Sequence, residues 1–293
     1  MARHFVDPRL RSLQEDFESY EKDLALKFKE LSRSNGHSRF AASRAILAIL
    51  AALRARVSIF ANSELRKFYQ ETDREIVKRL KAAGVTVLPL PKGSYFPIGQ
   101  QMVADVDRAI ASVSTLNQQG LEGNFLHLLP LSRIHTLTAE EIGPAGAKAF
   151  ADLATKRQVS VPTTGGRTRS YGISYYLSMV LASAFVRARV QAALDRTAEG
   201  GGDLVRVSPN PSTIGDFCDA YAGKVFSVNG ERSDVPKLSQ AVGGGPPFHV
   251  NCLHWLINLP PNYQPTRGDI VHENWLVRNQ QDAERVVKEW GRR

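Results

Sequence analysis

Two short runs decide the fold that this sequence predicts: FCDAYAGKVFS (217–227) and GPPFHVNCLH (245–254). Together they hold both cysteines of the chain and two of its seven histidines. Cys218 lies in the first run, and His249, Cys252 and His254 lie in the second. A tetrahedral zinc site needs about four such sulfur and nitrogen donors, often from two loops. We therefore expect Cys218, His249, Cys252 and His254 to bind a metal ion, with zinc as the cofactor.

The same residues also allow a metal-free interpretation. Tyr221 stands where a C-x-x-C motif would place its second cysteine, so the first run supplies one donor. Buried cysteines often act as small apolar side chains, and a loop histidine can serve as a hydrogen-bonding group. A metal-free cluster or a redox-labile cysteine pair therefore stays open beside the zinc site.

The ordered motifs of residues 160–260 resemble those of a known family. They are Gly165–Tyr171, Asp203–Ser208, then Cys218, Gly223, Lys224, Phe226 and Ser227, then Pro246, Pro247, His249, Asn251, Cys252 and His254. This set resembles the minor head proteins of tailed phages, meaning minor capsid protein 2 and the F-type head morphogenesis proteins of Mu-like phages. Val250 and Leu253 depart from the proline and arginine of that family's pattern.

The resemblance implies a structural role in a virion. It implies docking at the portal or the inner capsid wall, help in head assembly or genome packaging and delivery, and synthesis in the host cytoplasm. The implied partners are the portal protein and the major capsid protein, with genomic DNA as a further partner.

Charge suggests a second class of function, a nucleic-acid-binding virion protein. The formal net charge is +9 and the sequence pI is near 9.7. A basic excess attracts nucleic acid or an acidic protein surface. The basic residues are spread over several predicted helices, and we name Arg187, Arg189 and Arg196 as the candidate contacts.

A Cys/His-dependent enzyme is the third class. Cys252 beside His249 and His254 could act as a thiol nucleophile with a base. His249, Asn251 and His254 could also form a metal nuclease site. The sequence offers no third group that would orient either arrangement, so we expect no catalysis.

Apolar periodicity predicts an α+β fold, in which a long-helix N-terminal arm precedes a small module with short strands. Asn229-Gly230 predicts a turn, and Gly84 predicts a helix stop. We expect a helical scaffold or docking region over 1–160, the α+β module over 161–262, and a tail with a helix over 263–293. The predicted helices are 8–32, 38–83, 100–119, 174–197 and 281–290, and the predicted strands are 85–89, 204–208, 224–228 and 253–259.

Cysteine usage and hydropathy bear on the compartment. Two cysteines in 293 residues argue against a disulfide scaffold and suit a reducing cytosol. The apolar stretch Ala45–Leu53 is far shorter than the ~20 residues of a membrane span. We therefore expect no membrane-spanning segment.

Overall fold

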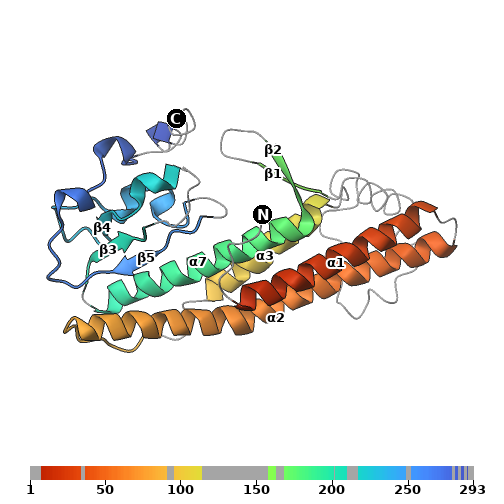
Figure 1. The fold of residues 1–293 in the computed structure, drawn as a ribbon, viewed down its shortest axis with the longest axis horizontal. Helices are drawn as coiled ribbons and strands as arrows, with labels where there is room; N and C mark the ends of the chain where they lie inside the picture. Colours follow the sequence, from red (N-terminus) through yellow and green to blue (C-terminus); the bar gives the residue numbers. More distant parts are fainter. Residues whose placement is uncertain are drawn as a thin grey trace. The chain divides into compact units, whose positions relative to one another are not determined.

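The protein has an α+β fold, with long helices toward the N-terminus and a small antiparallel sheet toward the C-terminus (Figure 1). The fold class predicted from the sequence is confirmed. The computed structural model describes residues 8–33, 37–90, 96–113, 158–162, 168–200, 202–209, 217–248, 252–278, 281–282, 285–286 and 289.

The chain divides into two compact units. Unit 1 comprises Met1–Ala61 and Gln100–Leu181, and unit 2 comprises Asn62–Gly99 and Ala182–Arg293. Each unit therefore combines residues from both sides of position 160.

Unit 1 is built on a pair of helices, α1 (Pro8–Arg33) and the first half of α2 (His37–Ala82). Helix α1 buries one stripe at helical spacing, Leu10, Leu13, Phe17 and Leu24, and α2 buries Leu50, Leu53, Val57 and Phe60. An ion pair of 2.7 Å between Arg56 Nε and an Asp16 oxygen links the two helices. The helix–break–helix pattern predicted from the sequence is confirmed at both helices.

Helix α3 (Phe96–Val113) adds a further layer to these helices. Its Met102 and Val106 are fully buried. Arg54 of α2 donates two hydrogen bonds, of 2.7 and 3.1 Å, to the carboxylate of Asp107. The helix predicted over 100–119 is thus present but begins earlier, and 114–119 lie outside the described residues.

A β-hairpin precedes the last long helix. Strands β1 (Gln158–Pro162) and β2 (Thr168–Gly172) pair antiparallel, with Gln158 opposite Gly172 and Pro162 opposite Thr168. Helix α7 (Ile173–Gly200) follows β2 directly. Sequence patterning missed this hairpin because neither five-residue strand is an uninterrupted run of β-favouring residues.

Gly84 ends α2 as predicted, with a φ of 78°. The amides of Gly84 and Val85 donate to the Lys81 and Leu80 carbonyls, each at 3.0 Å. A positive φ suits glycine because it has no Cβ to clash. The strand predicted over 85–89 is wrong, because these residues join no described sheet and the Leu88 carbonyl instead accepts a hydrogen bond from Arg196.

In unit 2, helix α7 supplies a buried face rich in alanine. Ala188, Ala192 and Ala193 are fully buried. The Phe185 ring lies 4.4 Å from the Phe68 ring of α2, centroid to centroid. Small residues along one face allow close packing of neighbouring elements. The helix predicted over 174–197 is confirmed.

Helix α7 is relevant to the prediction that the chain has no membrane-spanning segment. Among the described helices, Ser174–Glu199 alone passes a length and composition test for a membrane span, with a mean hydropathy of 1.3. Yet 72% of the apolar stretch that passes this test is buried inside the protein. A helix that is apolar because it lies in a protein core passes the same test.

The sheet of unit 2 has the order β4-β3-β5, with β3 (Leu204–Val207) in the centre. Both neighbours, β4 (Val225–Ser227) and β5 (Leu256–Asn258), run antiparallel to β3. The Asn258 amide of β5 donates to the Ala193 carbonyl and to Thr197 Oγ1 of α7, at 2.8 and 2.9 Å. The strands predicted over 204–208 and 224–228 are confirmed. The third is shorter than predicted, so Cys252 and His254 precede β5 instead of starting it.

The carboxylate of Asp203 organises the turn after β4. It accepts hydrogen bonds from Ser227 Oγ and from the amides of Asn229 (2.6 Å) and Arg232 (3.2 Å). Gly230 takes the positive φ that this turn needs, at 79°. The turn predicted at Asn229-Gly230 is confirmed, and a buried acidic side chain holds it.

The chain after β5 packs back onto the sheet. Tyr263 and Ile270 lie against the cluster of Leu204, Val225, Val235 and Leu259. Tyr221 Oη donates to the Trp275 carbonyl at 2.6 Å. We call residues 202–278 of unit 2 the C-terminal lobe. Beyond it, the described positions between 281 and 289 are helical, as predicted for the tail.

Candidate metal centre

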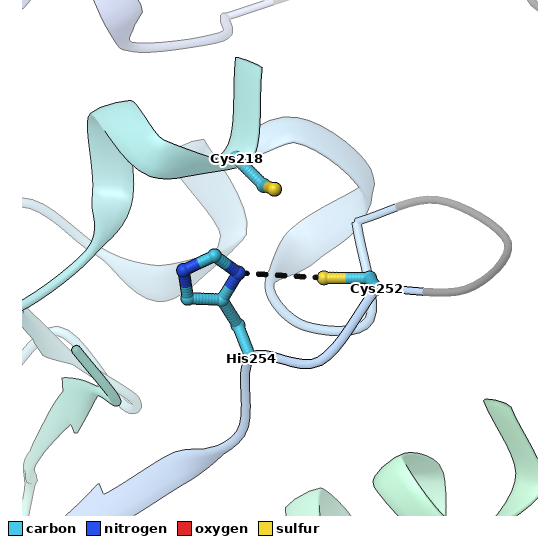
Figure 2. Close-up of side chains that lie close together, drawn as sticks. All are labelled: Cys218, Cys252 and His254. Atoms are coloured by element: carbon cyan, nitrogen blue, oxygen red, sulfur yellow. Dashed lines mark hydrogen bonds between the residues drawn. The ribbon is translucent and has the colours of Figure 1, made fainter. Parts of the chain in front are cut away.

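Three of the four predicted metal ligands meet inside the C-terminal lobe. Cys218 lies in the 3-10 helix Phe217–Tyr221, and Cys252 and His254 lie in the extended segment before β5 (Figure 2). The donor atoms of the three side chains all lie within 4.8 Å of one another. Cys252 Sγ is 3.6 Å from His254 Nδ1. His249, the fourth predicted ligand, lies outside the described residues.

Strand β3 anchors both segments that carry the site. On one side, the Val207 carbonyl accepts a hydrogen bond from the Gly223 amide at 3.0 Å, just after the 3-10 helix. On the other, the Ser208 amide donates to the Trp255 carbonyl at 2.8 Å. Gly223 has a φ of 73°, which lets the chain turn back from the 3-10 helix into β4. The donors therefore converge because one strand end binds two distant segments.

The site is closed to solvent. Cys218, Cys252 and His254 are 2%, 1% and 0% exposed. The Phe248 ring packs its edge against His254 at 6.0 Å between centroids, and Tyr221 stacks on Phe248 at 4.7 Å. Aromatic rings on this side keep the sulfur and nitrogen atoms in a medium of low polarity.

The two thiols are electrostatically linked. A hydrogen bond from Cys218 is the largest influence on Cys252 and lowers the pKa of its thiol to about 4. Burial acts against this lowering, and hydrogen bonding to His254 adds to it. This lowering favours the thiolate of Cys252, which is the form that binds metals.

One ring nitrogen of His254 has no hydrogen-bond partner among the described residues. It is the buried Nε2 atom, on the opposite side of the ring from Nδ1 and Cys252. Unpaired buried polar atoms are rare in proteins, because each loses its hydration without compensation. Since Nδ1 is the ring nitrogen beside Cys252, an ion held by the sulfurs and Nδ1 would leave Nε2 unpaired.

The donor set fits a transition-metal ion. Two sulfurs and an imidazole are the ligands that zinc takes in structural sites. Zinc–sulfur bonds of about 2.3 Å and zinc–nitrogen bonds of about 2.0 Å place tetrahedral ligands roughly 3.5 Å apart. The 3.6 Å between Cys252 Sγ and His254 Nδ1 matches that spacing. The buried cluster could hold a metal ion, with three protein ligands from the described residues.

Tyr221 has a role that the sequence did not indicate. In the sequence, Tyr221 stands where a C-x-x-C motif that begins at Cys218 would have its second cysteine. Burial raises the pKa of its phenol to about 12, so it stays protonated and donates to the Trp275 carbonyl. It thereby joins the metal-site wall to the segment after β5. A tyrosine between small residues carries no sequence signal for such a contact.

The three predicted nucleic-acid contacts occupy different environments. Arg196 is 5% exposed, pairs through two nitrogens with Asp73, and donates to the Leu88 carbonyl. Its guanidinium lies inside unit 2 and is bonded to protein groups, and its contact with nucleic acid stays a prediction. Arg187 is partly buried and has interactions within the protein.

Arg189 lies over the indole of Trp255, with its guanidinium carbon 4.1 Å from the ring centroid. Burial lowers the pKa of this guanidinium, and the nearby Glu75 carboxylate opposes that effect. The pair lines a groove beside β5 together with Thr72 and Arg79 of α2. Trp255 thus fixes Arg189 by a cation–π contact.

Comparison with known proteins gives no relative. The sequence matches no known protein family, and no curated protein or solved structure is significantly similar to it. The likeness to phage minor head proteins therefore rests on the motifs alone.

Proposed function

We propose that this protein is a structural component of a tailed-phage head whose C-terminal lobe is closed by zinc. Cys218, Cys252 and His254 would be three of the ligands, and His249 the fourth. The observation that carries the proposal is the meeting of two thiols and an imidazole from separate segments in a buried site. That arrangement suits an ion that closes a small lobe.

A structural site fits better than a catalytic one. Catalytic zinc keeps an open coordination position for water or substrate, whereas structural zinc is enclosed by four protein ligands. The three described donors are at most 2% exposed, so they present no open face on which a bulky substrate could bind. The same burial speaks against Cys252 as a nucleophile toward such a substrate, although the adjacent imidazole is otherwise suitable.

In this proposal the helical part serves as the docking element. The partners would be the portal protein and the major capsid protein at the portal vertex or inner capsid wall. Genomic DNA would be a secondary partner through the net positive charge. A dedicated nucleic-acid-binding role has weaker support, because Arg196 is committed to Asp73.

Elemental analysis of the purified protein tests the zinc site. We expect about one zinc per chain for the natural sequence. His254→Ala and His249→Ala should each lower the zinc content and the metal affinity. His272→Ala is the matched control, because His272 is exposed and lies outside the cluster. Less than half an equivalent of zinc in the natural protein contradicts the site.

Co-purification tests the role in the head. The chain is co-expressed with a portal protein and a major capsid protein from the same source, and portal rings are isolated by sedimentation. The proposal expects the chain to sediment with the rings or with assembled heads. Its absence from both, with the chain folded and zinc-loaded, contradicts the head role and leaves the metal site intact.

A further inference from the structure

We infer that Cys218 and Cys252 form an intramolecular disulfide when the metal is absent and a peroxide is present. The same site would then close the C-terminal lobe covalently instead of by coordination. The inference rests on the proposed function, in which the Cys218, Cys252 and His254 cluster holds the C-terminal lobe closed.

The two sulfur atoms are already neighbours. They lie within 4.8 Å of each other, and both face the His254 ring (Figure 2). A disulfide needs a sulfur–sulfur bond of about 2.05 Å, so the two sulfurs have to move closer for the bond to form.

The chain offers no competing partner. Cys218 and Cys252 are its two cysteines, so one intramolecular disulfide is the sole pairing within the molecule. Both cysteine residues are at most 2% exposed, which disfavours a bond to a second chain. Oxidation of the folded protein should therefore give a single product.

Hydrogen peroxide is the oxidant that joins the two sulfurs. The Cys252 sulfur, which lies 3.6 Å from His254 Nδ1, attacks the peroxide and breaks the O–O bond. The departing hydroxide takes the thiol proton to become water, and Cys252 becomes a sulfenic acid. Cys218 sulfur then attacks the Cys252 sulfenic acid. The S–O bond breaks, and the leaving hydroxide takes the Cys218 proton as a second water. Two thiols are oxidised and one peroxide is reduced.

The disulfide and the metal exclude each other. A zinc ion needs both thiolates, and their oxidation removes two of its ligands. A phage structural protein is made in a reducing cytosol and then leaves it inside the particle. The lobe would be held by metal in the first setting and by a disulfide in the second.

The experiment uses the full chain after removal of metal with a chelator. The protein is treated with hydrogen peroxide, digested without reduction and analysed by mass spectrometry. We expect a cross-linked peptide that joins Cys218 to Cys252 and is lost on treatment with dithiothreitol. The cross-link should raise the folded-to-unfolded ratio on the order of a hundredfold, by restricting the unfolded chain.

Matched variants separate the steps. In Cys218→Ser no cross-link can form, so Cys252 should be oxidised past the sulfenic acid to the sulfinic acid. His272→Ala should cross-link at the natural rate, because that histidine lies outside the cluster.

The outcomes separate this inference from the zinc proposal. Disulfides between chains, or over-oxidation of both thiols without a cross-link, overturn the inference even in a protein that binds zinc. A cross-link in a protein that binds no zinc supports the inference and contradicts the metal site.

Discussion

Single side chains fix the segment that packs back on the sheet, and Asp269 is the clearest example. Its carboxylate accepts from the Thr266 amide (2.8 Å) and hydroxyl (2.9 Å), from Tyr263 Oη (2.8 Å), and from Arg206 (2.9 Å). The Thr266 amide is the largest influence and, with the other donors, lowers the pKa of Asp269 to about 2. One acidic residue thus ties the chain after β5 to β3.

This lowering predicts a loss of stability in acid. Because the carboxyl pKa is about 2 in the folded protein and about 3.9 in an unfolded chain, the unfolded state binds more protons between these values. The stabilisation is complete above about pH 4 and is lost as the pH falls toward 2. Asp269→Asn should therefore be less stable than the natural protein at pH 6, and the difference should shrink toward pH 2.

Urea unfolding at a series of pH values measures this difference. Glu273→Gln, a change at an exposed carboxylate nearby, is the control and should leave the stability within about 0.5 kcal/mol at every pH. A difference for Asp269→Asn that stays constant from pH 6 to pH 2 contradicts the assignment.

At the scale of elements, a buried ion pair joins α2 to α7 within unit 2. The Arg196 side chain is 5% exposed and the Asp73 side chain 19%, and the two meet through two nitrogens and two oxygens. Arg196 also binds the Leu88 carbonyl, so a third segment depends on it. Removing one partner of such a pair leaves the other charge buried without compensation.

Arg196→Met should therefore destabilise the protein by about 3 kcal/mol. Asp73→Leu together with Arg196→Met should recover part of that loss, since neither charge then stays unpaired. Chemical denaturation of the single and double variants gives the coupling energy.

Arg79→Met is the matched control for this cycle. Arg79 is 59% exposed and pairs with Glu75 at a loose 3.8 Å, so its loss should cost at most about 0.5 kcal/mol. The same variants test the nucleic-acid alternative, because DNA retention of folded Arg196→Met should equal that of the natural protein. If folded Arg196→Met retained less DNA than the natural protein, while Arg79→Met did not, Arg196 would be a DNA contact.

At the scale of the whole molecule, the three described donors of the metal centre all belong to unit 2. Structural zinc stabilises the folded state because the unfolded chain has no preformed site. Unit 1 contains none of these three residues and keeps its own buried helix faces and ion pairs. Metal binding should therefore stabilise unit 2 more than unit 1.

Scanning calorimetry of the zinc-loaded and chelated protein tests this unevenness. Chelation should lower the Tm of the unfolding of unit 2 by several degrees or more, because the bound state loses its ligand-linked stabilisation. Hydrogen exchange should rise at amides of the C-terminal lobe and stay constant along α1. Equal effects in both units would contradict a site confined to the lobe.

Local chemistry accounts for what the sequence alone determined. Helical periodicity located α1, most of α2 and α7, Gly84 ended α2, and Asn229-Gly230 marked the turn after β4. Each of these signals depends on neighbours within a few residues, because backbone preference and amphipathic spacing act at short range. The types and positions of the sulfur and nitrogen donors were likewise readable.

Tertiary structure decided the rest. Cys218 meets Cys252 and His254 because β3 binds both of their segments, and no spacing in the sequence encodes that strand order. The burial of Arg196 and the pairing of β1 with β2 also follow from contacts between distant segments. A residue's type sets the chemistry it can offer. The packing of distant segments sets its exposure and partners, and thereby whether that chemistry is used.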